Sequence, residues 1–244
     1  MGSLMLRTKT LVRVLTATAV GIAVLGAAAA SASIVTVTYT GTAIGYDYLR
    51  LFLPLNQPRF YVTDPFIAVY TYNTRLGLLH KGSYSEYADG GSLYGRSSPI
   101  TSATLTINGH SQTVTSKTIG TAEVFGGGAG IVEESAYDSS VYNYSRYLWT
   151  QVGTEFVPTD LETPFSRGST GPYSYQSKGY FSEAGDIFDV HITDFLALTP
   201  DHVTVDVAAA VPEPATWSLM LFGFGSIGAI TRSRLRRSGS TISI

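Results

Sequence analysis

Apolar and polar residues alternate with a period of two through the middle of the chain, from about residue 33 to residue 207. Residues 34–40 alternate in this way and stop at Gly41, and Asn108-Gly109 separates two further alternating runs. An Asn-Gly pair at that place favours the tight type I′ turn of a β-hairpin. Similar short runs lie between turns rich in glycine and proline. They cover residues 66–72, 123–125, 131–132, 141–152, 186–195 and 202–207.

Runs of this length and spacing are typical of packed antiparallel sheets, and no helical period of useful length interrupts them. The pattern therefore predicts an all-β fold: a single antiparallel β-sandwich (jelly-roll-like) domain over residues 33–207, with about eight to ten strands. The segments 45–58, 82–99 and 153–179 are predicted to be loops, because glycine and proline break them repeatedly. A domain of this length can bury a sizeable core.

The first 32 residues differ from this pattern and have the features of a secretory signal peptide. Three basic residues precede an apolar stretch at 14–30, and Ala30 and Ala32 form a small-x-small cleavage site. The alternative is an uncleaved membrane anchor. Small residues at the end of the stretch, followed at once by a strand pattern, favour cleavage after Ala32.

The end of the chain has three segments in a fixed order: a rigid motif with two prolines, an uncharged apolar run at 215–231, and a basic cluster. The prolines prevent both helix and strand pairing in the motif. The run has about 17 residues, the short end of what can span a bilayer as a helix. A tryptophan at its start and arginines at its end are typical of a membrane interface and of cytoplasmic stop-transfer charge. The residues that carry this pattern are Val211, Pro212, Glu213, Pro214, Trp217, Arg232, Arg234, Arg236 and Arg237.

The sequence thus predicts one C-terminal transmembrane helix at 215–231, an arginine-rich cytoplasmic tail to residue 244, and the bulk of the protein outside the membrane. A linker at 208–210 joins the β domain to the motif. The alternative for the apolar run is a buried core helix, but a core helix seldom ends in a cluster of arginines at the chain terminus.

These three segments resemble the PEP-CTERM sorting signal, and the tryptophan after Pro-Glu-Pro-x-x is similar to the version common in alphaproteobacteria. The resemblance covers residues 211–237. It implies export, transient anchoring in the inner membrane, recognition by an exosortase near Pro-Glu-Pro, and delivery to the cell surface or extracellular polymer matrix. The leader adds the Sec translocon and signal peptidase as partners. One departure is the seven-residue tail after Arg237.

Charge narrows the choice of partners. The whole chain has a formal charge of −2, but three basic residues lie in the leader and four arginines in the tail. The region between them keeps nine basic and 17 acidic residues, a formal charge of −8. This argues against nucleic acid and anionic membrane surfaces as partners. The absence of cysteine excludes disulfides and thiol chemistry.

Candidate chemistry in the β region is sparse. Asp186, Asp189 and Asp194 offer oxygen ligands that suit Ca²⁺ as a cofactor; the alternative is a plain acidic surface. The pairs Glu133–Glu134 and Asp160–Glu162 are candidates for glycoside hydrolysis, although adjacent strand residues point to opposite faces.

Aromatic residues supply the last candidate site. Tyr142, Tyr144, Tyr147 and Trp149 lie close together in the sequence and are candidates for stacking on sugar rings. The alternative for such a cluster is core or cross-strand packing.

Taken together, the sequence favours an exported, non-enzymatic protein with a structural or adhesive role at the surface or in the extracellular matrix. Its precursor would be anchored in the inner membrane with the ectodomain in the periplasm. The alternative is a carbohydrate-binding module for an exopolysaccharide, and the third hypothesis is a secreted hydrolase.

Overall fold

The computed structural model describes residues 33–208, without residues 57–59, 127–129, 140–143 and 188–189, and without the side chains of 171–173 and 185–192. The predicted leader, the linker beyond Ala208, the sorting motif and the predicted transmembrane helix lie outside this part of the chain.

The described chain forms twelve strands and two short 3-10 helices. Their order is β1 (Ile34–Tyr46), β2 (Tyr61–Asn73), β3 (Leu78–Lys81), β4 (Ser85–Gly90), η1 (Ser92–Tyr94), β5 (Ile100–Ile107), β6 (His110–Val114), β7 (Ile119–Phe125), β8 (Gly130–Ser139), β9 (Ser145–Thr154), β10 (Phe165–Gly168), η2 (Gly171–Gln176), β11 (Lys178–Ile187) and β12 (Val190–Ala208).

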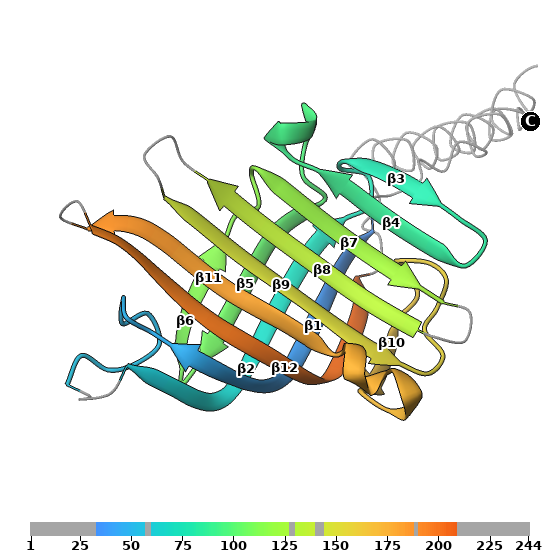
Figure 1. The fold of residues 1–244 in the computed structure, drawn as a ribbon. Helices are drawn as coiled ribbons and strands as arrows, with labels where there is room; N and C mark the ends of the chain where they lie inside the picture. The colour runs from blue at the N-terminus through green and yellow to red at the C-terminus, as the bar shows by residue number, and fades with distance from the viewer. Residues whose placement is uncertain (1–32, 57–59, 127–129, 140–143, 188–189, 209–244) are drawn as a thin grey trace, which may run out of the picture. The chain divides into compact units, whose positions relative to one another are not determined.

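All twelve strands belong to one antiparallel sheet (Figure 1). Its order is β3-β4-β7-β8-β9-β11-β12-β1-β2-β5-β6, and β10 pairs with the end of β12 beside this path. The prediction of an all-β, antiparallel fold is confirmed.

The sheet curls over so that its two ends face each other (Figure 1). Strands β7, β8 and β9 pack against β5 and β6, which lie at the other end of the strand order. This arrangement places a core between two layers, as in a sandwich. The predicted jelly-roll-like sandwich is nevertheless corrected, because hydrogen bonding runs without a break from one layer to the other through β12 and β1.

Strand β1 shows how the sequence pattern produces this core. Val35, Val37 and Tyr39 are fully buried, while the threonines between them lie on the outer face. The Asn108-Gly109 hairpin is also confirmed: φ is 53° and 78° at these two residues, and they connect β5 to β6.

Some boundaries differ from the prediction. The alternating stretch 186–195 contains the end of β11 and the beginning of β12. Two predicted loops contain short strands, β4 and β10. Strand β4 ends in Asp89-Gly90, residue types that strands disfavour, and β10 has four residues, too few to show a period.

Gly41 marks a bulge in the pairing of β1 with β12, between Thr40 and Gly41. A Cβ atom at Gly41 would lie 2.1 Å from the carbonyl oxygen of Thr199 and 2.7 Å from Cα of Pro200. Both are backbone atoms, so no side-chain rotation relieves the clash. Glycine at this position therefore allows β1 and β12 to approach each other.

We expect Gly41→Ala to lower the free energy of unfolding by about 2–3 kcal/mol, because the added methyl group must displace the β12 backbone. Gly168→Ala is the matched control, since its nearest atom would be 3.6 Å away. Chemical denaturation of both variants measures the difference. Equal stabilities would show that β1 and β12 are not packed this closely.

Candidate functional site

Three tyrosines project from β1 and β2 into the core and connect the two layers. Tyr39, Tyr70 and Tyr72 are all buried, and burial raises the pKa of each. Tyr70 Oη shares a 3.0 Å hydrogen bond with Thr150 Oγ1 on β9, and Tyr72 Oη donates to the carbonyl of Leu161 at 2.8 Å. The layers are thus joined by polar contacts as well as by apolar packing.

The third contact joins Tyr39 to a buried acid. Tyr39 Oη donates to Oε2 of Glu134 on β8, which is fully buried. Burial raises the pKa of Glu134 to about 8; nearby Glu133 adds to the rise, while the Tyr39 hydrogen bond opposes it. Glu134 is therefore mainly a neutral acid at pH 7. Its Oε1 has no hydrogen-bond partner among the described residues.

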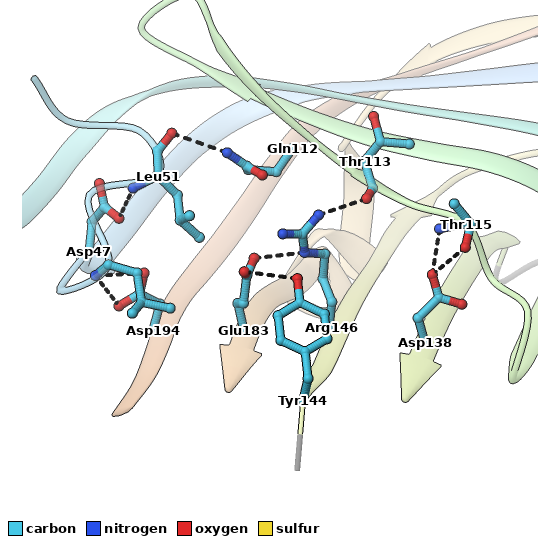
Figure 2. A network of polar contacts seen from close by, with 11 residues as sticks. Asp47, Leu51, Gln112, Thr113, Thr115, Asp138, Tyr144, Arg146, Glu183 and Asp194 are labelled. Carbon is cyan, nitrogen blue, oxygen red and sulfur yellow. Dashed lines mark hydrogen bonds and ion pairs between the residues drawn. The ribbon is translucent and has the colours of Figure 1, made fainter. Parts of the chain in front are cut away.

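A second set of polar contacts joins the two layers along one open side of the curled sheet (Figure 2). Arg146 of β9 makes a 2.7 Å ion pair with Glu183 of β11 and donates to the carbonyl oxygen of Thr113 on β6 at 2.9 Å. Asp138 of β8 accepts hydrogen bonds from the backbone N–H groups of Thr115 and Lys117 just after β6. Side chains of one layer thus bind backbone groups of the other.

Two buried aspartates fix the loop that follows β1. Asp47 accepts the backbone N–H groups of Leu51, Phe52 and Leu53, at 2.7–2.8 Å. Asp194 of β12 accepts the N–H of Leu49 at 3.0 Å. Burial, with a further contribution from Asp47, raises the pKa of Asp194 to about 7. The Asp47 carboxyl group therefore holds the loop in its folded form from within, and the Asp194 carboxyl group binds the loop to β12 (Figure 2).

Asp194 is also one of the three aspartates of the predicted calcium site. The side chains of Asp186 and Asp189 lie outside the described residues, and Asp194 binds the loop after β1. Within the described part of the chain, no group of three His, Cys, Asp or Glu residues could hold a metal ion.

The Glu133–Glu134 pair, a candidate for glycoside hydrolysis, is divided between the two faces of β8. Glu134 points into the core, while Glu133 lies on the outer face in register with Gln151. Asp160 accepts hydrogen bonds from Thr163 Oγ1 and the N–H of Glu162 within its own loop.

The predicted aromatic cluster divides between two places. Tyr142 lies outside the described residues, and Tyr144 donates to Glu183 at the closed side of the curl, 2.9 Å away. Tyr147 and Trp149 alternate with the buried Leu148, so they lie on the outer face of β9. These two residues belong to a larger set.

That set, here called the aromatic row, crosses six neighbouring strands on the outer face. It begins on β8, passes over β9, β11, β12 and β1, and ends on β2 and the loop after β1. Successive rings lie 4.9–6.0 Å apart within each of two groups, and Phe195 and Tyr46 connect the groups as opposite residues of β12 and β1. The row consists of Tyr137, Tyr147, Trp149, Tyr180, Phe195, Tyr46, Tyr48, Phe60 and Tyr61.

Sequence reasoning found two members of the row and missed the other seven. Three of the missed residues lie on three different strands, β8, β11 and β12, and the other four lie at the end of β1, in the loop that follows it and at the start of β2. Only the strand order brings these positions together, and the strand order cannot be predicted from the spacing of residues along the chain.

Comparison with known proteins identifies the end of the chain. A family model for the PEP-CTERM protein-sorting motif matches residues 210–237, which confirms the resemblance found in the sequence. The match implies an exported protein whose membrane-anchored precursor is processed by an exosortase. No curated protein and no solved structure matches the chain. Among the described residues, no helix is long and apolar enough to cross a membrane.

The pKa of Glu134 predicts a pH-dependent stability. The folded protein binds this proton more tightly than the unfolded chain, so the free energy of unfolding should fall as pH rises from about 4.5 to about 8. Glu134→Gln removes this contribution. Between about pH 5 and pH 7, the free energy of unfolding of the variant should therefore fall less steeply with pH than that of the wild type, by about 1.4 kcal/mol per pH unit. The slope that remains in this range includes the contribution of Asp194.

Urea denaturation across this pH range measures both slopes. Glu155→Gln is the control, because Glu155 is exposed. If the free energy of unfolding of Glu134→Gln fell with pH as steeply as that of the wild type, the assignment of Glu134 as a neutral acid in the core would be contradicted.

Proposed function

We propose that this protein is an exported, non-enzymatic surface protein with a structural or adhesive role in the extracellular matrix. The single observation that carries the proposal is the match to the sorting motif at residues 210–237. In this account, Sec export and cleavage after Ala32 release the N-terminus. A helix at 215–231 then anchors the precursor, with the domain in the periplasm and the arginines in the cytoplasm.

Processing would follow at the motif itself. The exosortase would recognise the Pro212-Glu213-Pro214 segment, together with Val211 and Trp217, and release the β domain to the cell surface. Trp217 at this spacing favours the alphaproteobacterial version of the signal.

The properties of the β domain agree with a passive role outside the cell. Its core is joined across the layers by hydrogen bonds rather than by disulfides, and the chain contains no cysteine. Its negative charge favours solubility. Glu134 is buried in the core, Glu133 lies on the other face of β8, and Asp160 accepts hydrogen bonds within its own loop, so no observation in the described residues favours the hydrolase hypothesis over this one.

A second candidate function is carbohydrate binding, which the aromatic row favours. Aromatic rings grouped on an outer sheet face are the arrangement that distinguishes this alternative from a purely structural role. The two functions are compatible, because a matrix protein can be retained by the polymer it binds.

The sorting route predicts a defined mature protein. Intact mass spectrometry of the protein from the native host should give a chain that begins at Ser33 and ends near Pro-Glu-Pro, found outside the cell. Pro212→Ala combined with Pro214→Ala should retain the arginine tail and remain with the membrane, because the rigid motif is lost.

Pro164→Ala is the matched control, since it replaces an exposed proline of the β domain. A wild-type protein that keeps its arginine tail when mature, and that responds to neither change, would contradict exosortase processing and leave the C-terminal span as a permanent anchor.

A further inference from the structure

The aromatic row forms a continuous outer face. Tyr46 on β1 is opposite both Phe195 on β12 and Tyr61 on β2, and these three side chains are 50%, 52% and 47% exposed. On the other side, Trp149 on β9 is opposite Tyr180 on β11. At about 4.8 Å between strands, six strands give the row a length of about 24 Å.

The rings are fixed by their surroundings. Tyr180 contacts Tyr147, Trp149 and Phe195, with ring centroids 4.9, 5.5 and 5.7 Å away. All four project from paired strands, so their separation is determined by the sheet. A ligand that stacks on them would therefore lose little free energy to ordering of the protein.

The loop end of the row is fixed as well. Tyr48 and Phe60 lie on the loop that contains Asp47 and that Asp194 binds to β12, and the guanidinium of Arg50 lies 4.1 Å from the centre of the Phe60 ring. Tyr48 stacks on Tyr46 with an interplanar angle of 5°. The buried aspartates thus position the aromatic residues at this end.

The chemistry of the row fits a ligand with flat apolar faces and hydroxyl edges. Its tyrosine hydroxyls, with Ser182 between Tyr147 and Phe195 in the register, provide hydrogen-bonding groups beside the rings. We propose that the aromatic row binds an uncharged polysaccharide, laid across the strands with its sugar rings on the aromatic faces. This proposal rests on the proposed function, which brings the domain outside the cell where such polymers occur.

Charge decides between an uncharged and an acidic polymer. The β region has a formal charge of −8. Glu123 and Glu133 lie opposite each other on the outer faces of β7 and β8, in the layer that contains the Tyr137 end of the row. A polyanion along the row would be repelled by this field, whereas an uncharged chain would not. Lys178 and Arg50 lie beside the row, 5.7 Å from the centre of the Trp149 ring and 4.1 Å from the centre of the Phe60 ring, and both cations are already included in the formal charge of −8.

Trp149 makes the test direct, because the chain has two tryptophans and processing at Pro-Glu-Pro removes Trp217. The mature protein from the native host should then report binding through Trp149 fluorescence alone. Titration with a soluble uncharged glucan should give a saturable change in emission, and alginate should give none. Intact mass shows separately whether processing has occurred, so failure of the sorting route is distinguished from failure of the binding proposal.

Variants locate the site. Tyr180→Ala should weaken binding about tenfold or more, because Tyr180 contacts three other rings of the row, while Tyr180→Phe should retain most of it. Tyr84→Ala is the matched control, an exposed tyrosine (64%) away from the row. Circular dichroism and thermal unfolding confirm that each variant is folded.

Several results would overturn the proposal. These are a folded mature protein that binds none of a panel of uncharged polysaccharides, one that binds alginate alone, or equal effects of Tyr180→Ala and Tyr84→Ala. Light scattering that shows a dimer dissociated by Tyr180→Ala would assign the row to a second copy instead, and binding to neutral lipid vesicles would assign it to a membrane surface.

Discussion

The pairing of β12 with β1 is the interaction on which the rest of the structure depends. β12 is 19 residues long and pairs with β1 along the full length of that strand. It also pairs with β11 through its first part and with β10 through its last part, so one strand connects the two layers. Without this pairing, the layers would be two separate sheets, and the aromatic row would be divided between them. The same register places Ile34 opposite Ala208, so the two ends of the described domain leave the sheet side by side.

In a curled sheet whose two ends are not paired with each other, the buried polar groups must still find hydrogen-bond partners. In the core, Tyr39 and Tyr70 hydrogen-bond to residues of β8 and β9 in the opposite layer, and Tyr72 donates to the loop that follows β9. At the open side, Arg146 and Asp138 bind backbone groups at and just beyond β6, which is the last strand of the sheet order. These contacts use unpaired edge groups that would otherwise be available to another chain. The domain therefore closes through side chains where backbone pairing ends.

The sequence predicted the parts of this fold that depend on local pattern. The alternation in residues 34–40 and the Asn108-Gly109 turn determined the faces of β1 and the β5–β6 hairpin, because side-chain period and turn type are local properties. Strand order is not local, and it decides that Tyr46, Tyr180 and Phe195 share one face. Tyr144 shows the reverse case: it is close to Tyr147 in sequence, but its hydroxyl binds Glu183 at the edge of the core. The sorting motif needed no fold, since its proline, tryptophan and arginine positions are read directly from the chain.

Hydrogen–deuterium exchange of the mature protein, resolved by peptide and mass spectrometry, tests the central claim most directly. The account predicts the slowest exchange in the middle of β1 and β12, where each strand is paired on both sides, and fast exchange in the edge strands β3 and β6. Exchange in β12 as fast as in β3 and β6 would contradict a single curled sheet joined at β12 and β1.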